Sequence, residues 1–180
     1  LKRENIQDET VRGYIEVLDM KSQRLKQLTE DLKCFKQADF KFCMLLNGNC
    51  YGSEALSVKF FDKLGNAIME VMSSFGLNSV TTASPVIAAF LKQHFPALHI
   101  RASVNMEIGT PEGVEYLLDD FDSFYLKREY NYDLPRLTRM RDICHANGKK
   151  LYILTYDHGG YVLWKDEVKP RLLKIFDWLE

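Results

Sequence analysis

Three consecutive charged residues, Lys127-Arg128-Glu129, follow directly on the aromatic and apolar stretch Phe124-Tyr125-Leu126. Aromatic and apolar residues favour a buried strand, so the charges stand where such a strand ends. Glu129 could act as a general base, and Arg128 could clamp a carboxylate or a phosphate. Lys127 could form a Schiff base if its amine were desolvated. The run is therefore a candidate catalytic and binding site.

Polar side chains end the other expected strands as well. His158 could serve as an acid or a base in a Gly-rich loop, and Arg101 could share an anion with Arg128. In a parallel sheet these strand ends meet at one edge, which predicts a shared site. Helix capping explains Ser84 and Thr110 better than function does. The remaining candidate ligand-binding residues are Asn47, Asn49, Ser103, Asn105 and Asp157.

The elements that must position these residues alternate between strands and helices. Periodicity and turn residues predict five strand-then-helix units, with short helix–strand loops. The predicted strands are 40–46, 78–82, 98–105, 124–126 and 150–156. The predicted helices are 8–35, 53–75, 84–94, 110–120, 133–146 and 166–179. This alternation predicts an α/β fold with a parallel sheet.

The residue pattern of the segment 99–105 distinguishes a barrel from a doubly wound sheet. Ile100, Ala102 and Val104 form one apolar face, whereas Arg101, Ser103 and Asn105 form a polar one. A second polar face does not suit a sheet covered by helices on both sides, but it suits the inside of a TIM-type barrel near its mouth. Five units are fewer than the eight of a closed barrel, so we expect a partial or whole TIM-type barrel built of parallel (β/α) repeats.

We expect residues 1–180 to form one α/β domain, with a helical segment 1–37, βα repeats over 38–161 and a final helix 162–180. The chain begins with Leu and ends on an apolar helical pattern, which predicts a fragment of a longer barrel. Seven apolar residues in 11–35 recur at mostly helical spacing. Such a stripe usually packs on its own domain, but oligomerisation through this helix is a second interpretation.

The amino-acid composition further limits the classes of function that fit this chain. The chain is 46% hydrophobic and 27% charged, with a formal net charge of -1, which argues against a general electrostatic grip on nucleic acid. No apolar run is long enough to cross a membrane. The cysteines show neither C-x-x-C nor zinc spacing, so the cofactor is unknown and no zinc or iron–sulfur ligand set is visible. Cys43 and Cys144 lie in apolar segments, which predicts buried, reduced thiols and a cytoplasmic protein.

The order of several short motifs resembles the collagenase-like peptidase family, whose catalytic mechanism is uncertain. The matching stretches are Leu45-Leu46-Asn47, the segment 95–105, Leu126-Lys127-Arg128-Glu129 and Asp157-His158-Gly159. The resemblance covers about 40–161 and implies a TIM-like barrel. By position it marks Ser103, Asn105, Arg128, Glu129, His158 and Gly159 as family-like. In the family, a cysteine closely follows the last of these motifs, and in some members this cysteine is linked to an iron–sulfur cluster. In this sequence no cysteine follows Asp157-His158-Gly159, so the chemistry of the cluster is not carried over.

Together these features predict a peptidase-like hydrolase that binds an anionic or peptide-like small ligand at the carboxyl-terminal mouth of its strands. Glu129 and His158 would transfer protons, while Arg101, Arg128 and Lys127 would hold the anion. Two alternatives stay open: a non-catalytic binding or scaffold domain, and a Schiff-base lyase or aldolase that uses Lys127.

Overall fold

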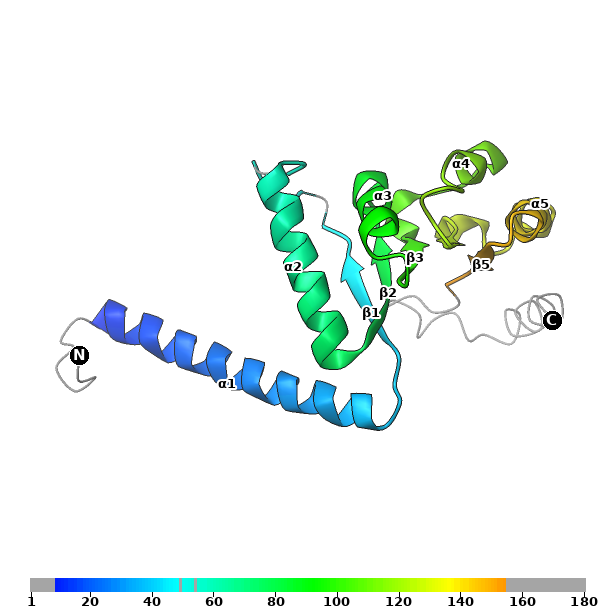
Figure 1. The fold of residues 1–180 in the computed structure, drawn as a ribbon. Helices are drawn as coiled ribbons and strands as arrows, with labels where there is room; N and C mark the ends of the chain where they lie inside the picture. The colour runs from blue at the N-terminus through cyan, green and yellow to red at the C-terminus, as the bar shows by residue number, and fades with distance from the viewer. Residues whose placement is uncertain (1–8, 49, 54, 155–180) are drawn as a thin grey trace, which may run out of the picture.

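Five parallel strands form one sheet in the computed structural model, which describes residues 9–48, 50–53 and 55–154 (Figure 1). The strands pair in sequence order, β1-β2-β3-β4-β5. Thr81 of β2 lies between Leu45 of β1 and Arg101 of β3, so the carboxyl ends of these strands meet at one edge. The strands are β1 (Phe42–Leu46), β2 (Leu77–Thr82), β3 (His99–Ala102), β4 (Ser123–Tyr125) and β5 (Lys150–Tyr152).

Local capping signals explain where the helices begin and end. The Ser84 and Thr110 side chains accept hydrogen bonds from the backbone N–H groups three residues on, and a proline follows each at the first helical position. Asp133 caps the next helix in the same way. The helices are α1 (Glu9–Gln37), α2 (Val58–Phe75), α3 (Pro85–His94), α4 (Pro111–Tyr116) and α5 (Leu134–Ala146), with the 3₁₀ turns η2 (Val104–Met106) and η3 (Arg128–Tyr130).

The sheet has an apolar face toward the helices and a polar face away from them. In β3, Ile100 and Ala102 are fully buried, whereas His99 and Arg101, which alternate with them, are only half-buried. Figure 1 shows α2, α3, α4 and α5 in an arc around the strands. Crossovers between sequential parallel strands are nearly always right-handed, which puts the connecting helices on one face of a sheet, and TIM-type barrels are built from the same kind of unit. The predicted α/β fold of parallel (β/α) repeats is confirmed.

Several element boundaries differ from the sequence expectation. Ser57, rather than Ser53, caps α2 by accepting a hydrogen bond from the Phe60 N–H at 3.1 Å. Strand β3 ends at Ala102 because the Ser103 side chain caps η2. The first helix runs without a break from Glu9 to Gln37, α4 stops at Tyr116, and the predicted final helix lies outside the described residues. No described helix is long and apolar enough to cross a membrane.

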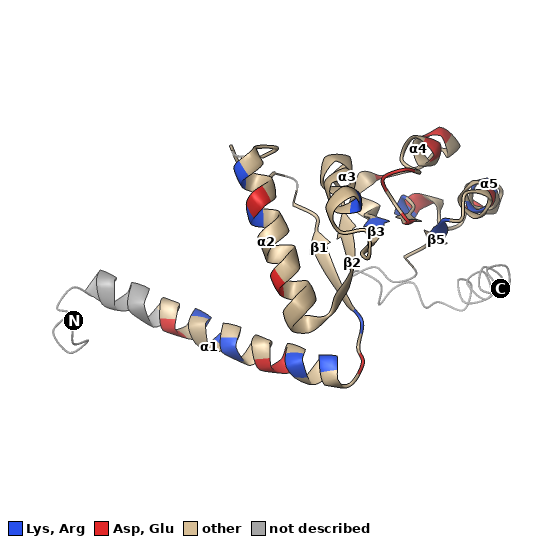
Figure 2. Cartoon of the chain, in the orientation of Figure 1, with Lys and Arg blue, Asp and Glu red and all other residues tan. Residues whose placement is uncertain are grey.

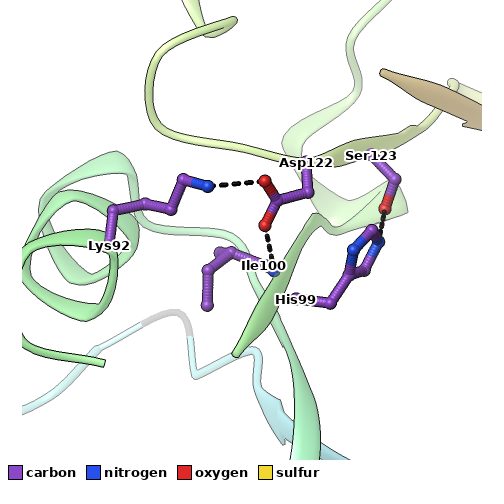
Figure 3. Close-up of polar contacts among 5 residues, drawn as sticks. All are labelled: Lys92, His99, Ile100, Asp122 and Ser123. Carbon is purple, nitrogen blue, oxygen red and sulfur yellow. Dashed lines mark hydrogen bonds and ion pairs between the residues drawn. The ribbon is translucent and has the colours of Figure 1, made fainter. Parts of the chain in front are cut away.

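Asp122 joins the elements at the opposite, amino-terminal edge of the sheet (Figure 3). Its carboxylate accepts hydrogen bonds from Lys92 Nζ of α3, at 2.5 Å, and from the backbone N–H of Ile100, at 2.8 Å. Its own N–H donates to the Ile100 carbonyl at 2.8 Å, and its carbonyl accepts from the Lys150 N–H at 3.2 Å. In TIM-type barrels the amino-terminal edge usually serves stability. Here Asp122 connects α3 to β3, β4 and β5.

Candidate functional site at the carboxyl ends of the strands

A pocket of about 290 Å³ opens at the carboxyl ends of β3 and β4. It lies where η2 follows β3 and η3 follows β4. Its lining carries two cationic side chains, two carboxylates and one amide, so it offers both signs of charge to a ligand. The lining residues are Val104, Asn105, Glu107, Lys127, Arg128 and Glu129.

The loop after η2 is fixed against η3 by contacts around Gly109. The Lys127 N–H donates to the Ile108 carbonyl at 2.9 Å. Arg136 Nη1 donates to the Gly109 carbonyl at 3.1 Å, and the Arg136 guanidinium lies 3.8 Å from the centre of the Tyr130 ring. A Cβ at Gly109 would overlap the same ring, so glycine permits the close approach. The two walls of the pocket are therefore held together by backbone and cation–π contacts.

Lys127 stands between the two carboxylates of the pocket. Its Nζ lies 3.4 Å from Glu129 Oε2 and 3.5 Å from Glu107 Oε2. The hydrogen bond to Glu129, followed by the charges of Glu107 and Glu129, raises the pKa of Lys127 above its ordinary value. A Schiff base requires the neutral amine, so this environment favours Lys127 as a fixed cation over Lys127 as a nucleophile.

Aromatic rings and a guanidinium line the inner face of the sheet next to this pocket. The Arg101 guanidinium lies 5.5 Å from the centre of the Tyr152 ring, within cation–π distance. The rings of Tyr125 and Tyr152 are 5.2 Å apart. These three residues come from β3, β4 and β5, so the inner face of the sheet carries one cation and two aromatic rings on neighbouring strands.

Three buried polar atoms have no hydrogen-bond partner among the described residues: Asn47 Oδ1, Arg101 Nε and Asn131 Oδ1. Asn131 is 8% exposed, and its Nδ2 donates to the Leu154 carbonyl at 2.6 Å, so only its oxygen is left over. Buried polar groups are nearly always paired in folded proteins. A bound ligand or ordered water at the mouth would satisfy them.

The structure brings together four of the predicted site residues: Asn105, Lys127, Arg128 and Glu129 line the pocket. Asn47 lies at the end of β1 and Arg101 on the inner face of β3. Ser103 is 1% exposed and its Oγ accepts from the Asn105 N–H at 3.2 Å, so its visible role is to cap η2. Asn49, Asp157, His158 and Gly159 lie outside the described residues.

Sequence reasoning missed Glu107, which closes the pocket opposite Glu129. It follows η2 with a left-handed backbone, φ 51°, a conformation that is uncommon for residues other than glycine. No local sequence signal marks that geometry. Its position in the loop after the polar strand 98–105 could have identified it as a third charge at the mouth.

A serine–histidine pair on the inner face resembles part of a hydrolase triad but lacks its geometry. His99 Nε2 lies 2.9 Å from Ser123 Oγ, and Asp122 is adjacent (Figure 3). The Asp122 carboxylate bonds to Lys92 and to Ile100 instead of orienting the imidazole. Ser123 is fully buried, and burial lowers the pKa of His99. The pair is therefore a structural contact near the amino-terminal edge of the sheet.

The cysteines correct one expectation from the sequence. Cys144 is buried, and burial raises the pKa of its thiol to about 11. Cys43 is exposed, because it lies on the inner face of the edge strand β1, with its Sγ 3.3 Å from Thr81 Oγ1. The prediction that both thiols are buried is wrong for Cys43. Among the described residues, no group of three His, Cys, Asp or Glu side chains could hold a metal ion.

Comparisons with known proteins support the fold. No family model and no curated protein matches the chain. Among solved structures, the chain is similar to that described as "The Structure of the U32 Peptidase Mk0906", with a TM-score of 0.62 and 17% sequence identity. The similarity covers 69% of this chain and 49% of that one, so this chain spans about half the length of that peptidase. At this identity the likeness is one of fold.

Proposed function

We propose that this protein is a peptidase-like TIM-barrel protein that binds a peptide-like or anionic ligand in the pocket between β3 and β4. The single observation that carries the proposal is the clustering of Arg128, Lys127, Glu107 and Glu129 around one cavity at the mouth of the strands. The fold similarity to a U32 peptidase supports the same class.

The charges of the pocket fit a ligand with both a carboxylate and a hydrogen-bond donor. Arg128 offers a planar fork for a carboxylate, and Lys127 adds a second cation whose raised pKa keeps it protonated. Glu107 and Glu129 are 70% and 66% exposed, so their oxygens can accept hydrogen bonds from an amine or from backbone N–H groups. A cavity of about 290 Å³ lies at the small end of ligand sites and would hold one or two residues of a peptide.

Glu129 is the proposed general base within the pocket. It lies 3.4 Å from Lys127 Nζ and would accept a proton from a water that attacks a bound amide. Lys127 and Arg128 would stabilise the negative charge that develops on the carbonyl oxygen. The proposed partner in proton transfer, His158, lies outside the described residues.

Binding is tested with a dye-labelled pool of random hexapeptides with free carboxyl termini, followed by fluorescence anisotropy. Arg128→Ala is expected to weaken binding about 10-fold, the equivalent of ~1.4 kcal/mol, and Lys127→Ala to act similarly. Arg139→Ala removes an exposed arginine of α5 and is the matched control. Equal binding by the Arg128 and Arg139 variants would remove the pocket from the proposal.

A non-catalytic binding domain is the second candidate function. The observation that favours it is that the Lys127 ammonium lies within ion-pair distance of both pocket carboxylates, so each carboxylate already has a cationic partner. Cleavage of the same peptide pool, followed by mass spectrometry, separates the two. Peptidase chemistry predicts products that Glu129→Gln abolishes while binding persists, whereas a binding domain gives binding without products.

A further inference from the structure

Helix α1 exposes a line of large apolar side chains that the described part of the chain does not cover. Leu18 and Leu25 are each 65% exposed, Leu28 is 52% exposed and Phe35 is 47% exposed. Figure 1 shows α1 running away from the sheet, with its carboxyl-terminal end beside α2. The expectation that this stripe packs on its own domain is therefore not met within the described residues. Helices in proteins take most of their stability from packing of an apolar face, so the exposed stripe of α1 calls for a partner.

The helix joins the rest of the fold mainly through its last turn. Lys36 Nζ donates hydrogen bonds to the carbonyls of Ser73 and Ser74, at 3.1 and 3.0 Å, at the end of α2. The rings of Phe35 and Phe40 lie 5.4 Å apart. At about 1.5 Å per residue, the turns before this anchor extend tens of ångströms beyond it.

The apolar residues of α1 repeat every seven positions. Val11, Leu18, Leu25 and Leu32 are each seven apart in the sequence, and Leu28 and Phe35 follow the last two at a spacing of three. A seven-residue repeat with a second apolar position three residues on is the a/d pattern of a coiled coil. A helix that only covers a globular core follows a period near 3.6 instead.

We propose that two copies of this chain associate through α1 as an antiparallel coiled coil. The occupant of the stripe is thus a second copy, because the repeat is self-complementary. Aligning each a position with a d position of the partner puts Leu25 opposite the partner's Leu28, and Leu18 opposite the partner's Phe35. The same alignment puts Lys21 opposite the partner's Leu32 rather than opposite another lysine, as a parallel pair would.

Charges beside the stripe complement each other in the antiparallel arrangement. Arg24 and Asp31 are seven residues apart and flank the seam on the same side, and the alignment brings Arg24 within two residues of the level of the partner's Asp31. Twofold symmetry repeats that pairing, which gives two attractive contacts across the interface. Figure 2 shows Lys and Arg interspersed with Asp and Glu along the described part of α1, so the faces next to the stripe suit water and a partner of the same composition.

Sedimentation equilibrium of the purified chain tests the association. The proposal predicts a species of twice 21.0 kDa. Leu25→Lys with Leu28→Lys is expected to shift the mass to that of one chain. Gln23→Lys with Gln27→Lys adds the same charges on the outer face of the same turns and should leave the dimer intact. Circular dichroism shows whether both double variants keep their fold, since lysine is a good helix former. A single-chain mass for the unchanged protein at all concentrations, or a dimer that survives the Leu25 and Leu28 changes, would overturn the proposal.

Cross-linking tests the orientation. With Cys34, Cys43 and Cys50 changed to serine, Leu25→Cys and Leu28→Cys proteins are mixed and oxidised. The antiparallel arrangement predicts a disulfide-linked dimer in the mixture and little in either protein alone. Cross-linking of the Leu25→Cys protein with itself would contradict the antiparallel alignment.

Discussion

Replacing Asp122 by alanine should destabilise the fold at the amino-terminal edge of the sheet. The Ile100 N–H loses its partner, and Ile100 is fully buried, which costs about 1–3 kcal/mol. The variant also loses the ion pair with Lys92. The side chains of Lys92 and Asp122 are 30% and 25% exposed, so this loss adds at most ~1 kcal/mol to the destabilisation. We therefore expect a loss of about 2–3 kcal/mol in the free energy of unfolding, or roughly 4–12 °C in Tm for a chain of this size.

The assay is urea denaturation followed by circular dichroism. Asp122→Asn keeps an oxygen that can accept a hydrogen bond from the Ile100 N–H, so its free energy of unfolding should fall by about half as much as that of Asp122→Ala. Asp119→Ala removes an exposed carboxylate nearby and is the matched control, with an expected change within ~0.5 kcal/mol. If Asp122→Ala and Asp119→Ala unfold at the same urea concentration, Asp122 does not join the strands as described.

Other consequences of the structure can be measured on the same protein. The pKa values of Asp122 and His99 both lie below their ordinary values of 3.8 and 6.5, so the stability that these groups contribute is present above those values. As the pH decreases, the free energy of unfolding should fall first below the ordinary value of His99 and then again in more acidic solution, below that of Asp122. His99→Gln should flatten the first of these two decreases, and an unchanged pH profile would refute the assignment of that decrease to His99. Gly109→Ala should lower stability by about 1–3 kcal/mol because a Cβ meets the Tyr130 ring, and Tyr130→Leu in the same chain should recover part of the loss; no destabilisation would contradict the close approach. Iodoacetamide at neutral pH should label the exposed Cys43 while Cys144, with its pKa near 11, stays unmodified until the protein unfolds; early labelling of Cys144 would contradict its burial.

Much of the fold followed from local signals in the sequence. The pairs Ser84-Pro85 and Thr110-Pro111 fixed the starts of α3 and α4 because capping and the proline ring act within one turn. The alternation of strand and helix patterns predicted the parallel sheet. The start of α2 was placed too early because Ser53 and Ser57 are both good caps, and only the packing of the helix decides between them.

The site was predictable only in part because its geometry depends on contacts between distant segments. The run Lys127-Arg128-Glu129 identified one wall. The other wall includes Glu107, whose position depends on a left-handed backbone and on the contact of Gly109 with Tyr130. Cys43 illustrates the same limit: its apolar neighbours predicted burial, but its strand lies at the edge of the sheet, with that face exposed.

The anisotropy titration of the labelled hexapeptide pool against the unchanged protein, Arg128→Ala and Arg139→Ala tests the central claim most directly. The proposed site predicts saturable binding by the unchanged protein and by Arg139→Ala, with an affinity about 10-fold lower for Arg128→Ala at equal thermal stability. Equal affinities for all three proteins, or no binding to any of them, would contradict a peptide-binding pocket at the mouth of the strands.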